Sequence, residues 1–213
     1  AELIPFFLRH YGSFADEISV WDDKSSDGSQ DLLRAHPKVL LRDWPYDTGI
    51  DEDQFLKHAY EWYPKAHPKF DWVMWVDMDE FIYSKNIMKT LEECSDFEVI
   101  HTMAFNMTGE GLPKDDGKHQ IYELSPYGVY APVYSKPVVF RPSATVRWIR
   151  GKHALENCNP KMTPKAMFKL FHYRYMGAAY TAKRNALNYA RCGLKNGDKN
   201  AAWSCSPGYN GVD

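Results

Sequence analysis

DWVMWVDMDEF, residues 71–81, places three carboxylates directly after an apolar run. Residues 71–76 are expected to form a strand, and residues 72–76 are apolar at every position, which is typical of a central strand covered on both faces. Side chains alternate along an extended strand, so Asp77 and Asp79 are expected on the same side. Two carboxylates there repel each other unless a proton or cation lies between them, and Mg²⁺ or Mn²⁺ prefers such oxygen ligands. The stretch therefore predicts either a metal site at the carboxyl end of a strand or a solvated acidic turn.

Patterns on both sides of this stretch alternate between strands and helices. Helices are expected at residues 2–12, 30–35, 51–63, 87–93 and 180–192; strands are expected at 18–21, 39–41, 98–105, 133–140 and 145–149, with a strand-like aromatic segment at 168–175. The alternation in the first half predicts an α/β fold with a partly parallel sheet.

A second polar cluster follows the strand expected at residues 18–21. Asp22, Asp23 and Ser25 belong to a dense run of turn-forming residues that ends at Ser29. The carboxylates are suited to accept hydrogen bonds from a base or ribose, and the hydroxyls and turn amides are suited to phosphate. The alternative is an ordinary Asp/Ser/Gly turn that caps the next helix.

Composition excludes several classes of protein. The 213 residues fit one large domain or two small ones, and 26 Lys and Arg against 28 Asp and Glu give a formal charge of −2. Without a basic excess, nucleic-acid binding is not expected. No apolar stretch approaches the roughly 20 residues of a membrane span, and no signal peptide is visible, so we expect a cytoplasmic protein. Aromatic content is 15%, which suits both core packing and ring stacking.

Six motifs along the chain share their order with one known group of enzymes. They are AELIPFFLRHY (1–11), ISVWDDKSSDGS (18–29), DWVMWVDMDEF (71–81), KPVVFRP (136–142), GKH (151–153) and HYRY (172–175) followed by Lys183. Together they resemble glycosyltransferases of the GT-A fold, in the family 2-like group related to the family 92 enzymes. The resemblance implies one domain over residues 1–213 with a Rossmann-like mixed sheet flanked by helices. Residues 1–84 would be the nucleotide-sugar half and 85–213 the acceptor half.

One departure from the family pattern concerns the start of the chain. Members of the group usually begin with a strand and an Asn-Glu pair before the helix that resembles residues 2–12. Residue 1 already lies inside or just before that helix. The expected sheet therefore lacks its first strand, and the expected base-recognition set is incomplete.

The resemblance also implies roles for individual residues. Asp79 would be the main ligand of a Mn²⁺ or Mg²⁺ cofactor, Asp77 would contact the metal or the ribose, and His153 would be a third metal ligand. His172 would contact the diphosphate or pack in the core. The expected nucleotide-binding residues are Asp22, Asp23, Ser25, Asp77, Arg174 and Lys183.

An inverting transfer needs a general base to deprotonate the acceptor hydroxyl. Glu110 is the preferred candidate, because it lies between two glycines on the loop where this group places acceptor-side residues. Glu156 is the rival, and a retaining enzyme would need neither as base.

The expected function is transfer of a sugar from a nucleotide-sugar donor to a hydroxyl of a carbohydrate acceptor, as in polysaccharide biosynthesis. A nucleotidyl or phosphoryl transferase would also use paired Asp residues and a divalent ion. A non-catalytic carbohydrate-binding module would instead use aromatic side chains as platforms, and four tyrosines of the second half suit such a role: Tyr122, Tyr127, Tyr130 and Tyr134.

Overall fold

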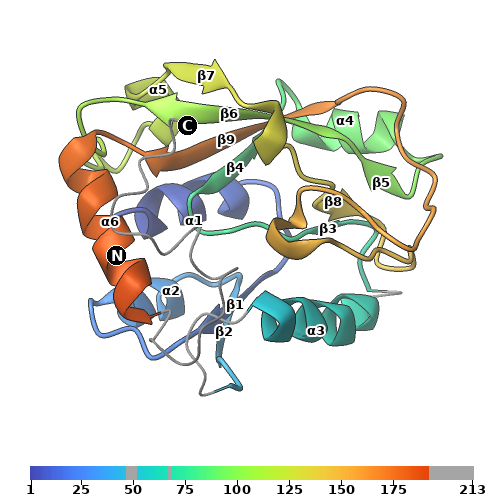
Figure 1. Cartoon of the computed structure of the whole chain (residues 1–213), viewed down its shortest axis with the longest axis horizontal. Helices are drawn as coiled ribbons and strands as arrows, with labels where there is room; N and C mark the ends of the chain where they lie inside the picture. The colour runs from blue at the N-terminus through green and yellow to red at the C-terminus, as the bar shows by residue number, and fades with distance from the viewer. Residues whose placement is uncertain (47–51, 67–68, 192–213) are drawn as a thin grey trace.

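The computed structural model describes residues 1–46, 52–66 and 69–191 (Figure 1). The helices are α1 (Ile4–Gly12), α2 (Ser29–Arg34), α3 (Glu52–Trp62), α4 (Ile87–Glu93), α5 (Ile121–Leu124) and α6 (Ala178–Arg191). The strands are β1 (Ile18–Asp22), β2 (Val39–Asp43), β3 (Val73–Met74), β4 (Glu80–Tyr83), β5 (Val99–Ile100), β6 (Thr102–Thr108), β7 (Gly128–Tyr130), β8 (Val139–Phe140) and β9 (Phe168–Tyr175). The protein is therefore a mixed α/β structure, as the sequence predicts.

The strands form three short sheets within the described ranges. β1 and β2 are parallel; β8 pairs with β3 and β5 in antiparallel fashion; the third sheet has the order β4-β9-β6-β7. In that sheet β6 and β9 are parallel, while β4 and β7 are antiparallel to their neighbours. The expectation of parallel pairs is confirmed, but the described strands form three separate sheets rather than the one mixed sheet that was expected, and residues of β1 and β3 line an open cleft.

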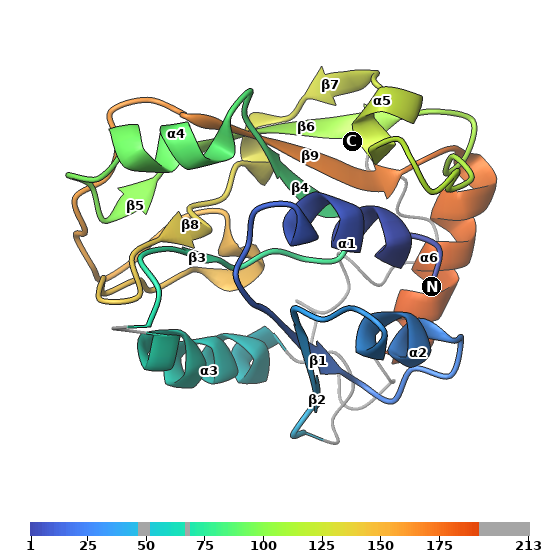
Figure 2. The ribbon, with the colours of Figure 1, turned by 180° about the vertical axis from the view of Figure 1, so that it is seen from behind.

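Helix α1 joins the four-stranded sheet to the rest of the molecule. Figure 2 shows α1 between that sheet and β1. Its apolar face buries Phe7 and Tyr11, whose rings lie 6.3 Å from the ring of Phe81 on β4. The Tyr11 hydroxyl donates to Glu80 O (2.9 Å) and accepts from Ile82 N (3.0 Å). The aromatic contacts of Phe7 and Tyr11 and the two hydrogen bonds of the Tyr11 hydroxyl thus hold β4 against α1. They also fix the position of the residues that precede β4.

The strand expected over residues 71–76 was wrong in length and in burial. β3 contains only Val73 and Met74, and residues 72–76 are half-buried rather than covered on both faces. One edge of β3 pairs with β8, whereas several of these residues line the open cleft. An apolar run does not reveal whether a second neighbour exists to cover it.

Two further strand predictions were also wrong. Within residues 133–140 only β8 is a strand, since a 3₁₀ turn occupies Pro132–Tyr134. Residues 145–149 form no strand, because tyrosine hydroxyls bind their main chain: Val146 N donates to Tyr63 Oη (3.2 Å) and Trp148 N donates to Tyr60 Oη (2.7 Å). The segment 98–105 is split into β5 and β6.

The helix predictions are confirmed within one or two residues for the parts that the structure describes. The residues Asp51 and Cys192, at the outer ends of two predicted helices, lie outside the described residues. The strand-like segment 168–175 is β9. Within the described ranges no helix is long and apolar enough to cross a membrane.

Candidate functional site

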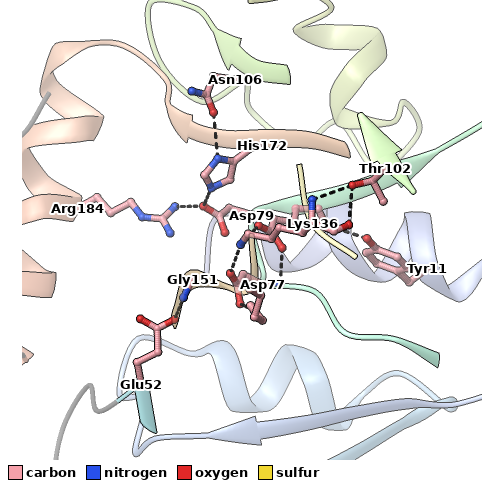
Figure 3. Close-up of polar contacts among 12 residues, drawn as sticks. Tyr11, Glu52, Asp77, Asp79, Thr102, Asn106, Lys136, Gly151, His172 and Arg184 are labelled. Carbon is pink, nitrogen blue, oxygen red and sulfur yellow. Dashed lines mark hydrogen bonds and ion pairs between the residues drawn. The ribbon is translucent and has the colours of Figure 1, made fainter. Parts of the chain in front are cut away.

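Residues 77–80 form a turn that presents three carboxylates. Glu80 N donates to Asp77 O (3.0 Å), and Asp77 N donates to the Glu80 carboxylate (3.0 Å). Asp77 and Asp79 are therefore not consecutive same-side residues of an extended strand, as the sequence suggested. Each carboxylate instead meets basic side chains: Asp77 and Glu80 share Lys136, and Asp79 faces Arg184 and His172, as Figure 3 shows for the two aspartates.

Asp77 binds two lysines that come from distant segments. Its carboxylate lies 2.7 Å from Lys152 Nζ and 3.2 Å from Lys136 Nζ. Burial raises the pKa of the Asp77 carboxyl, but the two ammonium groups outweigh that effect and hold the pKa below its usual range. Asp77 is therefore charged at neutral pH and its charge is already neutralised within the protein.

Lys136 also joins a buried ion pair with Glu80. The two side chains are almost inaccessible, and Lys136 Nζ lies 2.5 Å from Glu80 Oε1. The main chain of Lys136 is held by Thr102, whose hydroxyl donates to Lys136 O (2.7 Å) and accepts from Lys136 N (3.0 Å). Although burial lowers the pKa of Lys136, the facing carboxylates of Asp77 and Glu80 raise it above its ordinary value.

Asp79 is 2% exposed and faces Arg184 of α6 and His172 of β9. Its Oδ2 lies 2.7 Å from Arg184 Nη1 and 3.3 Å from His172 Nε2. Neither contact has hydrogen-bond geometry, so Oδ2 is a buried oxygen without a hydrogen-bond partner among the described residues. Burial raises the pKa of Asp79, but Arg184 and then His172 lower it well below its usual range.

The strand register of the four-stranded sheet explains why His172 faces Asp79. Glu80 on β4 pairs with His172 on β9, which pairs in turn with Asn106 on β6. His172 Nδ1 lies 3.1 Å from Asn106 Oδ1, on the side of the ring that faces β6. Nε2 is then the ring nitrogen that points at Asp79, as Figure 3 shows.

A strained loop brings Lys152 to Asp77. Gly151 has φ +80°, and a Cβ there would approach the His153 ring to 2.5 Å, so the position requires glycine. Lys152 has φ +61°, which is unfavourable for a residue with a side chain. The carboxylate of Glu52 at the start of α3 accepts from Gly151 N and holds this loop (Figure 3).

His153 follows this loop and is half-buried. Desolvation, with the positive charges of Lys136 and Lys152 among the further causes, lowers its pKa to about 4, so its imidazole is neutral at pH 7. Its Nδ1 is buried without a hydrogen-bond partner in the described parts of the chain, and its ring packs edge-on against Tyr134 at 5.6 Å. A neutral imidazole of this kind is suited to metal binding.

The expected metal set is not assembled as three ligands. No group of three or more His, Cys, Asp or Glu side chains among residues 1–46, 52–66 and 69–191 is placed to hold a metal ion. Asp79 and His172 do fit part of a divalent-ion site, because a buried carboxylate oxygen and a ring nitrogen face each other. Such a two-ligand set suits an ion that takes its other ligands from water and substrate phosphates.

Seven residues, which we call the charge cluster, therefore converge from separate segments: Asp77, Asp79, Glu80, Lys136, Lys152, His172 and Arg184. Its basic members come from the segment before β8, the strained loop, β9 and α6. The acidic and basic side chains of the cluster are paired, so their charges nearly cancel. The basic side chains that now contact carboxylates are also suited to bind the oxygens of an anionic ligand.

The residues expected to bind nucleotide are not all near the cluster. Asp22 ends β1, and its carboxylate accepts from Ser25 N (2.9 Å) and Gln30 Nε2 (2.7 Å), which stabilises the local turn. Asp23 lies in the same turn. Arg174 is half-buried on β9, whereas Lys183 is exposed and lies 3.8 Å from the exposed Glu2.

Neither candidate base contacts the charge cluster. Glu110 is exposed on the loop after β6, and its main chain packs against Gly177. Glu156 is exposed, and its main-chain N donates to Arg147 O (2.8 Å). In the described part of the chain, no side-chain hydrogen bond or ion pair joins either carboxylate to Asp77 or Asp79. Their assignment as base stays a prediction.

Sequence reasoning missed the residues that neutralise the carboxylates. Lys136 and Lys152 lie inside the KPVVFRP and GKH motifs, yet neither was assigned a role. Arg184 was missed by one position, since the neighbouring Lys183 was chosen instead. Residues 183 and 184 point in directions about 100° apart on a helix, so only one of them can face Asp79. The helical periodicity is the signal that distinguishes the two.

The fold and this site define a mixed α/β protein with an Asp-X-Asp turn neutralised by internal cations. No protein-family model matches the sequence, and no curated protein matches it. Among solved structures, it is similar to S. aureus TarS residues 1–349, with 13% identity and a TM-score of 0.46 over 97% of this chain and 66% of that one.

Two other structures of S. aureus TarS are also similar. One gives 10% identity and a TM-score of 0.44 over 95% of this chain and 39% of the other. The second, TarS 1–349 in complex with UDP-GlcNAc, gives 13% identity and a TM-score of 0.40 over 89% of this chain and 61% of the other. The chain thus spans less than two thirds of each. At such low TM-scores the likeness carries no argument about fold or function.

Proposed function

We propose that this protein is a metal-dependent glycosyltransferase, which moves a sugar from a nucleotide-sugar donor to a hydroxyl of a carbohydrate acceptor. In this proposal residues 1–213 belong to one GT-A-type domain, with residues 1–84 as the nucleotide half and 85–213 as the acceptor half. The observation that carries the proposal is the convergence of the Asp77–Asp79 turn with His172, Lys136, Lys152 and Arg184.

The cluster provides what departure of a nucleoside diphosphate requires. Negative charge develops on the diphosphate as the glycosidic bond breaks, and fixed positive charges lower the energy of that state. Lys152 and Arg184 have Nζ and guanidinium groups whose present partners are carboxylates, and phosphate oxygens are chemically similar acceptors. In this proposal they contact the diphosphate when donor binds.

Asp79 and His172 are the residues that would hold Mn²⁺ or Mg²⁺. The buried Asp79 Oδ2 lacks a hydrogen bond within the described structure, and His172 Nε2 faces it at 3.3 Å. A bound divalent ion supplies Lewis-acid stabilisation of the leaving diphosphate. His153 is neutral at pH 7 and adjoins the same region, so it remains our candidate for a further ligand.

The other expected roles are part of the proposal without added structural support. Asp22, Asp23 and Ser25 would contact base or ribose from the turn after β1, with Asp77, Arg174 and Lys183 completing the nucleotide contacts. Glu110, with Glu156 as rival, would act as base in an inverting reaction. Both carboxylates are exposed and unengaged by ion pairs among the described residues, which leaves them available to an acceptor.

The test is nucleotide binding with and without Mn²⁺. We expect UDP or another nucleoside diphosphate to bind in isothermal titration calorimetry only with Mn²⁺ present. Asp79→Asn should weaken that binding at least about tenfold, because it neutralises a charged ligand of the bridging ion. Asp96→Asn, which makes the same change on an exposed loop, is the matched control.

One observation favours a carbohydrate-binding module as the second candidate. Tyr127 and Tyr130 are 77% and 56% exposed at β7, which suits stacking on sugar rings. Tyr130 also contacts the ring of Phe105, and Tyr122 and Tyr134 are engaged in ring contacts within the protein. Two results together would replace the transferase with this candidate. Glycans would bind equally well to the Asp79→Asn variant and to the unchanged protein, and neither protein would bind a nucleoside diphosphate.

A further inference from the structure

The start of α3 contacts the strained loop that carries Lys152. The Glu52 carboxylate accepts a hydrogen bond from Gly151 N, as Figure 3 shows. The neighbouring Asp53 carboxylate accepts from Arg150 Nε (2.9 Å) and from Arg150 Nη2. Two adjacent carboxylates of one helix thus hold two adjacent loop residues that lie 97 and 99 positions away in the sequence. We call these two carboxylates the α3 clamp.

The loop depends on such contacts because its conformation is unfavourable by itself. Gly151 and Lys152 both have positive φ angles, +80° and +61°. A residue with a side chain stays in the left-handed region only where its surroundings hold it there. Lys152 also packs against α3, since its Nζ lies 4.7 Å from the centroid of the Phe55 ring. The start of α3 therefore contacts three consecutive loop residues, 150–152.

Lys152 connects the α3 clamp to Asp77. The Lys152 side chain is 4% exposed and its Nζ lies 2.7 Å from Asp77 Oδ1, whereas the Asp77 side chain is 42% exposed. The lysine is thus enclosed by the protein, while the carboxylate that it contacts is open to a ligand. Within the described ranges, Asp77 is the residue to which Lys152 Nζ donates a side-chain hydrogen bond. The orientation of Lys152 therefore determines how one side of this carboxylate is held.

We propose that Glu52 and Asp53 are positioning residues of the nucleotide site. They hold the strained loop so that Lys152 keeps the Asp77 carboxylate in the place where it meets the donor. The inference rests on the proposed function, because that function assigns Asp77 and Lys152 to the donor. It adds two residues that act through the loop rather than by contact with the donor.

The probe is whichever of UDP, GDP, ADP and CDP binds the unchanged protein most tightly with Mn²⁺ present, measured by isothermal titration calorimetry. Glu52→Ala removes the acceptor for Gly151 N and should weaken binding of the probe about tenfold. Glu52→Gln loses the charge but keeps an oxygen that can accept from Gly151 N, so its affinity should lie within about twofold of the unchanged protein. This rescue separates the hydrogen bond from the effect of a negative charge at the end of a helix.

A double-mutant cycle tests whether Glu52 acts through Lys152. Lys152→Met should weaken binding at least about tenfold, because it leaves Asp77 with one of its two cations. In the Lys152→Met background, Glu52→Ala should add less than about twofold, since residues that act as one unit are not additive. A purely structural role of Glu52 would give the same loss in both backgrounds.

Glu61→Ala is the matched control, because it makes the same change at an exposed position near the other end of α3 and should leave binding unchanged. Exchange of the Gly151 amide with solvent, read by NMR in the free protein, should become faster in Glu52→Ala but not in Glu52→Gln. If near-UV circular dichroism shows that Glu52→Ala is not folded, Asp53→Ala takes its place. That variant removes an exposed ion pair and should weaken binding about threefold.

The results separate the inference from the proposed function. If the unchanged protein binds none of the four nucleotides, the proposed function fails and the inference falls with it. If one nucleotide binds, three results would overturn the inference by itself: undiminished binding to Glu52→Ala, equal losses in Glu52→Ala and Glu52→Gln, or additive losses in the cycle. A loss in Glu52→Ala that glutamine restores, and that disappears in the Lys152→Met background, supports the inference.

Discussion

The charge cluster and the open cleft lined by β1 and β3, which we call the strand cleft, differ in how their polar groups are satisfied. In the cluster each carboxylate has a basic side chain within 2.7 Å: Glu80 has Lys136, Asp77 has Lys152 and Asp79 has Arg184. In the cleft the polar groups belong to the outer edges of β1 and β3, each of which pairs with one strand among the described residues. Long side chains reach a partner across several segments, but a strand edge needs another strand alongside it.

The largest effect is expected from removing Lys136, because its loss leaves Glu80 as a buried, unpaired charge. Lys136→Met should lower the free energy of unfolding by about 3–5 kcal/mol, measured by urea denaturation. Lys89→Met is the control, since Lys89 pairs with Glu93 at 3.9 Å on an exposed helix face and should cost less than about 1 kcal/mol. Similar costs for the two variants would contradict the buried-pair interpretation.

A pH titration should separate the cluster from the buried histidine of α1, which contacts β4 through Ile82 O. His10 on α1 is buried, and desolvation lowers its pKa from 6.5 to about 4. His10 binds a proton more readily in the unfolded protein than in the folded one. Its contribution to the free energy of unfolding is therefore fully present above pH 6.5 and is lost as the pH falls to about 4. The expected loss is about 3 kcal/mol of unfolding free energy.

His10→Leu should make the curve of unfolding free energy shallower between pH 6.5 and 4, measured by urea denaturation at each pH. His153, whose pKa is also lowered to about 4, contributes part of the slope that is left. Asp77 and Asp79 have lowered pKa values, so their contribution is present above the ordinary carboxyl value and is lost only as the pH falls below about 4. If the slope of unfolding free energy against pH above pH 4 is unchanged in His10→Leu, other histidines dominate the pH dependence of stability.

Arg184→Gln tests whether the guanidinium occupies the place of a divalent ion. The variant leaves the buried Asp79 with His172 as its basic neighbour, so we expect a loss of about 1–3 kcal/mol in unfolding free energy without metal. Mn²⁺ at about one hundred times its dissociation constant should restore about 2.7 kcal/mol. Thermal unfolding with and without Mn²⁺ measures both, with the unchanged protein as reference. A variant that gains nothing from Mn²⁺ would argue against a metal at Asp79.

The smallest effect is expected at the strand cleft itself. Val139→Ala on the fully buried β8 should cost about 2 kcal/mol, whereas Val73→Ala, on half-buried β3 beside the cleft, should cost less than about 1 kcal/mol. Urea denaturation compares the two identical truncations. Equal costs would mean that the cleft closes around Val73 in solution.

Local patterns predicted the elements whose structure depends on their own residues. The apolar spacing of residues 2–12 and 87–93 gave α1 and α4, because an amphipathic face requires only a surface to pack on. The 145–149 prediction failed, since the hydroxyls of Tyr60 and Tyr63, more than 80 residues away, bind the main chain of that segment. No local pattern reports a hydrogen bond of that range.

The sequence by itself determined that an acidic turn follows an apolar strand and that a mixed α/β fold surrounds it, since both follow from residue order and periodicity. Tertiary structure alone decided the partners of that turn. Strand register placed His172 between Glu80 and Asn106, and α6 directs Arg184 rather than its neighbour Lys183 to Asp79. Charges attract at short range whatever their separation along the chain, so the chemistry of the site depends on which segments the fold brings together.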